Sequence, residues 1–215
     1  MNQASEPAEP PRDCPLCPRL VDYRRTNQTQ QPAWFNGPAP SFGDPNARLL
    51  VVGLAPGRGG ANRTGRPFTG DFAGVLLYET LIKSGFAIGR YDARPDDDLQ
   101  LVDCMITNAV RCAPPANRTT PAEEATCRPF LAARMAALPR LEVIVALGEV
   151  ARRNVVRALG ARPAPSRGHG AEADVGRYRL ISSYHCSRLN TNTGRLTTPM
   201  FEAVFERARD LLDLA

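Results

Sequence analysis

The stretch Arg48–Gly53 (RLLVVG) is an almost uninterrupted apolar run that ends in glycine, and it decides the fold. Met105–Val110 (MITNAV) and Glu142–Gly148 (EVIVALG) have the same character, and Tyr178–His185 (YRLISSYH) adds a fourth run. Strands that are buried on both faces of a parallel sheet show such continuous runs rather than an alternation of polar and apolar residues. The sequence therefore predicts a central four-stranded parallel sheet.

Stretches with helical character follow each of these strands. They are Phe72–Ser84, Pro121–Leu138, Glu149–Leu159 and Pro199–Leu214. The second of them has a typical helix start, with Thr120 as the cap and Pro121 in the first turn. The resulting β-α-β-α-β-α-β-α order predicts an α/β fold, a three-layer α/β/α sandwich. In such a sheet, ligands bind beyond the carboxyl ends of the strands.

The length of 215 residues suits a single domain, which we expect to span residues 13–215. Residues 1–12 are polar and proline-rich, which predicts a short disordered leader. They lack the apolar core of a secretory signal, and no apolar run reaches the roughly 18 residues of a membrane span. We therefore expect a cytoplasmic protein with no membrane partner. Gln28–Asn46 and Arg162–Gly176 are expected to form long connections.

The net charge of +5 comes almost wholly from arginine, because Lys83 is the only lysine. Guanidinium groups grip phosphate in a bidentate way, so the excess points to nucleic acid, although a general bias towards arginine would look similar. The segments that follow the predicted strands carry arginines that we expect on one face of the molecule: Arg58, Arg63, Arg66, Arg111, Arg118, Arg188 and Arg195.

Four of the six cysteines have the spacing of metal ligands. They are Cys14, Cys17, Cys112 and Cys127. A C-x-x-C pair lets two thiolates reach one centre, and four sulfur ligands suit either zinc or a cubane iron–sulfur cluster. Fourteen residues separate Cys112 from Cys127, which favours iron–sulfur over the short second knuckle of a zinc ribbon. Cys104 and Cys186 are expected to be ordinary buried thiols.

The glycine-rich stretch Gly53–Asp71 follows the first strand, but it contains neither the Gly-Lys-Ser/Thr of a P-loop nor the spacing of a dinucleotide-binding loop. Together with Thr107–Cys112 (TNAVRC) and Ser183–Asn190 (SYHCSRLN), it resembles the uracil-DNA glycosylase superfamily. The long form of the first motif and the Thr193–Thr197 (TGRLT) tail look most like family 5. So does the four-cysteine pattern, which families 4 and 5 share for a [4Fe–4S] cluster.

The resemblance implies a monomeric enzyme of base excision repair, acting at the bacterial nucleoid. Family 5 proteins flip uracil, and in many cases other deaminated bases, out of DNA and hydrolyse the N-glycosidic bond to leave an abasic site. One departure stands out, because His185-Cys186-Ser187 replaces the family's His-Pro-Ser. Losing the proline frees an N–H and relaxes a rigid turn, so we expect altered efficiency rather than lost activity.

The resemblance also assigns roles to residues in the pocket. Asp71 stabilises the sugar cation and orients water, and His185 donates a hydrogen bond to O2 of the leaving base. Asn108 reads the uracil edge, Phe68 stacks on the base, and the amide of Gly57 adds a donor. The residues alone leave other readings open: Asp71 as a helix cap, Asn108 as a turn cap and Phe68 as a core anchor.

At the DNA surface, Leu189 matches the family's intercalating loop and would fill the space left by the extruded base. Phosphate contacts are expected from Ser187 and from four arginines, namely Arg63, Arg66, Arg188 and Arg195. A non-catalytic iron–sulfur protein that binds damaged DNA remains the alternative, as does a zinc-dependent nucleotide hydrolase. A protein that only binds DNA needs none of Asp71, Asn108 and His185. A zinc hydrolase would need a cluster of His, Asp or Glu ligands near the strand ends, which the sequence does not offer. His169, in the predicted Arg162–Gly176 loop, is given no role.

Overall fold

The computed structural model describes residues 8–161 and 167–214, and the four predicted strands lie side by side at its centre. They pair in parallel in the order β5 (Cys104–Asn108), β2 (Leu49–Gly53), β6 (Val143–Leu147) and β8 (Tyr178–Ser183). Two short strands extend this sheet by antiparallel pairing. They are β1 (Phe42–Gly43) beside β5 and β7 (Glu172–Val175) beside β8.

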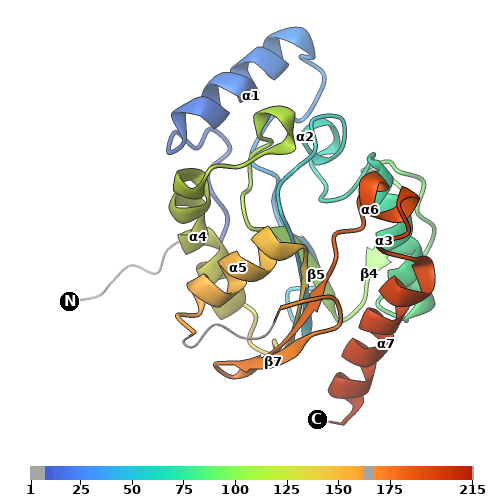
Figure 1. Cartoon of the computed structure of the whole chain (residues 1–215). Coiled ribbons are helices and arrows are strands. Elements are labelled where there is room, and N and C mark those ends of the chain that lie inside the picture. The colour runs from blue at the N-terminus through green and yellow to red at the C-terminus, as the bar shows by residue number, and fades with distance from the viewer. Residues whose placement is uncertain (1–7, 162–166, 215) are drawn as a thin grey trace.

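Helices cover both faces of the sheet, which confirms the predicted three-layer fold (Figure 1). Leu49 and Val51 face α3 (Phe72–Lys83) and α7 (Thr198–Asp213), whereas Leu50 and Val52 face α4 (Pro121–Ala136) and α5 (Glu149–Ala158). Successive side chains of a strand point to opposite faces, and here both faces are buried. This is why the strand sequence shows no alternation.

The predicted helix starts are where the sequence places them. Thr120 caps α4 by accepting from Glu123 N, and the Glu123 side chain accepts from Thr120 N in return, a capping box. The side chain of Asp71 caps α3 by accepting from Gly74 N, and that of Thr197 caps α7 by accepting from Met200 N. These caps fix where each helix leaves the loop before it, so Asp71 is held at the carboxyl end of the sheet.

Several short elements were not predicted. They are α1 (Pro18–Gln30), α2 (Ala61–Thr64), β3 (Ala87–Ile88), β4 (Gln100–Leu101), the 3₁₀ turn η1 (Pro115–Asn117) and α6 (Arg188–Asn192). Helix α1 is mostly polar, and its few apolar residues lie in its first two turns, so it lacks the apolar periodicity that reveals a helix. It overlaps the start of the expected connection Gln28–Asn46, while β7 lies within the expected loop Arg162–Gly176.

The described residues 8–13 are attached to the domain, whereas the sequence predicts a disordered leader over residues 1–12. Glu9 forms ion pairs with Arg111 and Arg134, both at 2.7 Å, and accepts a hydrogen bond from the amide of Ser41 at 3.1 Å. Arg12 stacks on the ring of Phe35 at 3.7 Å and donates to its carbonyl. The guanidinium of Arg111 is fully buried, so it needs this nearby negative charge.

The part of the predicted leader before residue 8 lies outside the described residues. No helix within residues 8–161 and 167–214 combines the length and apolar character that crossing a lipid bilayer requires.

Candidate active site

A cavity of about 620 Å³ opens beyond the carboxyl ends of the central strands. It is lined by eight of the residues that the sequence singled out: Gly57, Phe68, Asp71, Asn108, His185, Ser187, Arg188 and Leu189. These residues come from three stretches of the chain: the segment after β2, Asn108 at the end of β5, and the segment after β8. A concave site with a few convergent polar groups at this edge is the usual place for ligand binding in an α/β sheet.

Asp71 performs its structural role with one oxygen and keeps the other in the cavity. Its Oδ1 accepts from Gly74 N at 3.1 Å, which caps α3. Its Oδ2 lies over the glycine-rich loop, where a Cβ on Gly60 would stand 2.5 Å away and one on Gly57 3.3 Å away. Glycine at these positions therefore makes room for the carboxylate. Burial raises the pKa of Asp71, and the backbone hydrogen bonds at the cap oppose this rise.

Phe68 and Asn108 meet over the end of β2. A Cβ on Gly53 would lie 2.5 Å from Asn108 Oδ1 and 2.6 Å from Phe68 Cζ, so glycine is required for this close approach. The Asn108 side chain is buried at 2% exposure, and it makes no hydrogen bond with any of the described residues. An unengaged amide offers a donor and an acceptor to a ligand that enters the cavity.

The His185 ring lies against Phe68, with ring centroids 6.0 Å apart and planes inclined by 27°. Burial lowers the pKa of His185 to about 4, so the imidazole is neutral at neutral pH. Its Nδ1 is buried and has no partner in the described part of the chain. Gly148, with a φ of 91°, gives the ring room, since a Cβ there would lie 3.3 Å from that of His185. The neutral imidazole therefore has one N–H to donate and one nitrogen that can accept.

Cys186 fills the position where the resemblance would place a proline. Its thiol is completely buried and donates to the carbonyl of Ala73 at 3.5 Å, within the first turn of α3. Burial raises the pKa of this thiol, so it remains protonated. The contact ties the segment after His185 to the helix that Asp71 caps. Cys104 is also fully buried, and both cysteines are thus the ordinary core thiols that the sequence predicted.

The predicted DNA-contacting residues of α6 form the rim of the cavity. Leu189 is 72% exposed, although it is a large apolar side chain. Ser187 caps α6 by accepting from Asn190 N at 3.4 Å, and Arg188 lies 5.1 Å from the ring of Phe72. Arg195 is exposed and stacks on Tyr184 at 4.6 Å. Arg63 is likewise exposed, and its Nε donates to the carbonyl of Gly59 at 2.8 Å.

The prediction that Arg66 contacts DNA is wrong, because this side chain is buried at 6% exposure. Its guanidinium forms a two-pronged ion pair with Asp97, at 2.6 and 2.8 Å, and donates to Thr69 Oγ1 at 2.7 Å. The rings of Tyr78 and Tyr91 flank it. Arg111 is likewise excluded from the predicted basic face by its burial against Glu9. Both guanidiniums hold the fold together instead of meeting phosphate.

Sequence reasoning missed several residues of this site. Phe72, Pro114 and Asn117 also line the cavity. Phe72 directly follows Asp71 and is 40% exposed, so an aromatic residue at the first helical position was the available signal. His169 packs on Tyr184, with ring centroids 5.2 Å apart, and its Nδ1 accepts from Tyr184 N at 3.2 Å. It therefore supports the residue that precedes His185.

A second, smaller cavity is lined by the four predicted ligands Cys14, Cys17, Cys112 and Cys127, with apolar side chains around them. Arg111 N–H points to the sulfur of Cys127 at 3.4 Å, and Arg24 points to that of Cys112 at 3.8 Å. Soft thiolates that receive N–H donors in an apolar wall fit an iron–sulfur cluster. Within residues 8–161 and 167–214, no three His, Cys, Asp or Glu side chains converge closely enough to hold a single ion.

Comparison with known proteins agrees with this geometry. The model of the family described as "Uracil DNA glycosylase superfamily" matches residues 40–209. A Type-5 uracil-DNA glycosylase of Thermus thermophilus is 44% identical over 209 residues, which cover 94% of each chain. A Type-5 uracil-DNA glycosylase of Pyrobaculum aerophilum is 42% identical over 200 residues, covering 91% of this chain and 88% of the relative.

A Type-4 uracil-DNA glycosylase of Thermotoga maritima is 36% identical over 152 residues, which cover 70% of each chain. The similarity to Type-5 proteins thus extends over more of the chain than the similarity to this Type-4 protein, which confirms the family 5 resemblance read from the motifs. From its motifs, its cavity and these matches, the chain belongs to the uracil DNA glycosylase superfamily.

Proposed function

We propose that this protein removes uracil from DNA by hydrolysing the N-glycosidic bond, leaving an abasic site for base excision repair. The observation that carries the proposal is the convergence of Asp71, Asn108 and His185 on one cavity at the carboxyl edge of the sheet. A protein that only bound damaged DNA would need none of these three groups there. The Type-5 relatives, named as uracil-DNA glycosylases, support the same reaction.

The cavity can take a base that has been rotated out of the duplex. Extrusion costs a few kcal/mol of stacking and pairing, and an apolar side chain that enters the vacated space offsets part of this cost. Leu189 is suited to that role, because its side chain is 72% exposed at the rim of the cavity. Inside, Phe68 provides an aromatic face for the base, and the amide of Asn108 pairs with its edge.

The reaction breaks the bond between sugar C1′ and uracil N1, and the electron pair leaves with the base. Water adds to C1′ and gives up one proton, which the Asp71 carboxylate accepts and which finally neutralises the uracil anion. Asp71 also stabilises the positive charge that develops on the sugar. His185 donates an N–H to O2 of the leaving base, and a neutral imidazole with its pKa near 4 suits this task. The amide of Gly57 adds a second donor to the base.

The DNA strand would cross the rim of the cavity. Arg188 lines the cavity and is exposed, and Arg63 and Arg195 are exposed as well. We propose that these three arginines and Ser187 contact phosphate. We propose duplex DNA that contains uracil, or another deaminated base, as the substrate. We also propose that the protein acts as a monomer on the nucleoid DNA of the cytoplasm.

We propose that Cys14, Cys17, Cys112 and Cys127 hold a [4Fe–4S] cluster. The four thiols share one cavity, and the N–H donors that point at two of the sulfurs are typical of cluster sites. When bound, the cluster would cross-link the N-terminal segment to the loop after β5 and to α4. The hydrolytic step itself needs only the side chains of the larger cavity.

A duplex with a single U·G pair tests the proposed function. Incubation with the purified holoprotein, followed by alkali, should cleave the uracil strand at the position of the uracil. Asp71→Asn keeps an oxygen for the helix cap but removes the charge, so it should bind the duplex and lower the rate at least about 100-fold. Binding by the wild-type protein without any strand cleavage would leave a damage-binding protein as the better description.

A further inference from the structure

The stretch Arg66–Asp71 carries two of the pocket residues, and its backbone is unusual. Phe68 has a φ of 56°, in the left-handed region that aromatic residues rarely adopt. Such a conformation is unfavourable for a residue with a side chain, and it persists only where the surrounding structure fixes it. The orientation of the Phe68 ring, and the point at which the chain reaches Asp71, therefore depend on whatever holds this turn.

The turn is held by the loop between β3 and β4, residues 89–99, which contributed nothing to the sequence-based prediction. The hydroxyl of Tyr91 donates to the carbonyl of Phe68 at 3.2 Å and accepts from the amide of Gly70 at 3.2 Å. One side-chain oxygen thus bridges the two peptide groups on either side of Thr69, immediately before Asp71.

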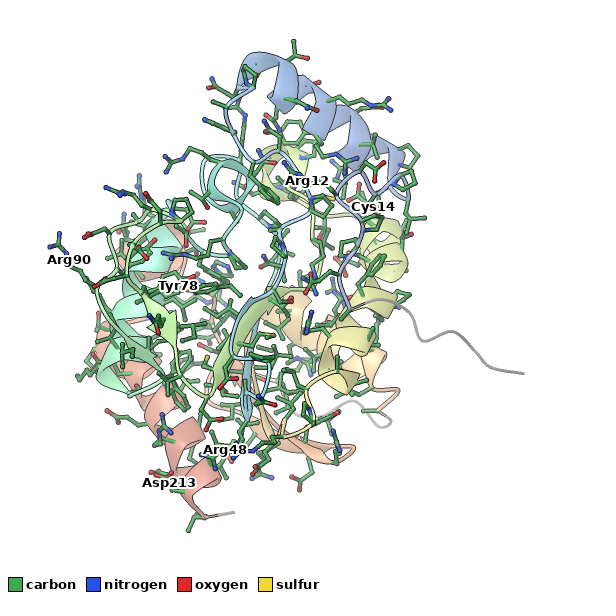
Figure 2. All side chains as sticks on the ribbon, turned by 180° about the vertical axis from the view of Figure 1, so that it is seen from behind. Arg12, Cys14, Arg48, Tyr78, Arg90 and Asp213 are labelled. Carbon is green, nitrogen blue, oxygen red and sulfur yellow. The ribbon has the colours of Figure 1, made fainter. Side chains whose placement is uncertain are left out.

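The same loop is attached to the turn at a second point. Asp97 forms the ion pair with Arg66 and also accepts from the amides of Asp92 and Leu99, at 3.0 and 3.3 Å. The Asp97 carboxylate therefore fixes the shape of the loop and also attaches the loop to Arg66. Figure 2 shows Tyr78 within the body of the molecule, whereas Arg90, the neighbour of Tyr91, points away from it at the edge.

The aromatic ring of Tyr91 has its own packing contact. It lies 4.5 Å from the ring of Tyr78, whose hydroxyl donates to the carbonyl of Pro67 at 2.6 Å. Gly74 leaves room for the hydroxyl of Tyr91, because a Cβ on residue 74 would lie 2.6 Å from the Tyr91 oxygen. The ring thus serves the packing, and the hydroxyl serves the turn, so the two contributions can be separated experimentally.

We propose that Tyr91 is a positioning residue for the glycosylase reaction. Its hydroxyl holds the Phe68–Gly70 turn so that the Phe68 ring meets the extruded base and Asp71 meets the sugar. This inference rests on the roles proposed above for Phe68 and Asp71. Tyr91 itself does not line the cavity, so it acts through those residues.

The test compares Tyr91→Phe with Tyr178→Phe in the holoprotein. Both variants lose one hydroxyl from a tyrosine that is at least partly buried, but Tyr178 packs in the core on the opposite face of the sheet. Losing the bridge leaves the Phe68 carbonyl and the Gly70 amide without their partner, so the turn no longer holds Phe68 and Asp71 in place. We expect Tyr91→Phe to lower the single-turnover excision rate about tenfold.

We expect the affinity for uracil-free duplex to stay near the wild-type value in both variants. Tyr91→Phe should lower the thermal midpoint by only a few degrees, so excision is measured well below it. Binding of free uracil, measured by calorimetry, should weaken in Tyr91→Phe alone. A wild-type excision rate in Tyr91→Phe overturns the inference. An equal loss of rate in Tyr178→Phe also overturns it, and so does a loss of rate in Tyr91→Phe that disappears when the assay is run well below the thermal midpoint. An inactive wild-type protein would instead refute the proposed function, and the comparison of uracil affinities would still decide the role of Tyr91.

Discussion

His185 should make the stability of this protein depend on pH in a way that a surface histidine would not. In the unfolded chain its imidazole titrates near the ordinary pKa of 6.5, whereas burial in the fold lowers that pKa to about 4. Between these values the unfolded state binds the proton and the folded state does not. Lowering the pH through this window therefore favours unfolding, and raising the pH above 6.5 restores the full stability.

The size of the effect follows from the gap between the two pKa values. At about 1.4 kcal/mol per pH unit, the free energy of unfolding should fall by about 2 kcal/mol between pH 7 and pH 5 because of this group alone. The total loss approaches roughly 3 kcal/mol once the pH reaches the folded pKa. A domain of this size has only about 5–15 kcal/mol of stability in all, so the change is easily measured.

Urea denaturation of the wild type and of His185→Gln, from pH 8 to pH 4.5, isolates this contribution. The difference in unfolding free energy between the two proteins should change with pH below 6.5 and stay constant above it. An NMR titration of the imidazole gives the folded pKa directly. If the two proteins lose stability in parallel, or if the folded imidazole titrates near 6.5, the burial argument for a neutral His185 is refuted.

Two other predictions concern the rim of the cavity and the cysteine cavity. Leu189→Ala should slow excision from duplex DNA roughly tenfold but hardly affect excision from single-stranded DNA, because an inserted side chain helps only where stacked bases must be separated. The control is Ile88→Ala, since Ile88 is also an exposed apolar residue, at 55%, but lies outside the cavity. Equal losses on both substrates would exclude this role for Leu189. The holoprotein should show visible iron–sulfur absorption, which zinc cannot give, and Cys112→Ser should lose it while Cys104→Ser keeps it. A colourless, zinc-containing protein would contradict the cluster.

The central sheet and its helices were predictable because their signals are local. Continuous apolar runs such as Val143–Leu147 and the cap at Thr120 are legible within a few residues. The positions of the pocket residues followed from the same logic, since parallel strands bring their carboxyl ends to one edge. Two-residue strands such as β1 and the polar helix α1 have no comparable periodicity, and only their tertiary contacts define them.

The arginines show most clearly what the sequence could not reveal. Arg63 and Arg66 are three residues apart in one motif, yet the first is exposed and the second is buried on Asp97. Their difference depends on a carboxylate 31 residues further along the chain, and no local pattern announces that pairing. The hydrogen bonds of the Tyr91 hydroxyl to Phe68 and Gly70 also join distant segments, so no local pattern predicts them either. Ion pairs and hydrogen bonds between distant segments decide which members of a motif face the ligand.

Glu9 alters where the folded unit begins. Composition predicts a domain boundary at Asp13, just before the first cysteine, and a shortened protein would ordinarily be designed to begin there. Such a chain would lack the carboxylate that pairs with Arg111, which would lower the free energy of unfolding by up to about 3 kcal/mol. The backbone N–H of Arg111 also contacts the sulfur of Cys127, so the loss would lie next to the cysteine cavity. Glu9 is therefore part of the folded unit, which begins no later than this residue.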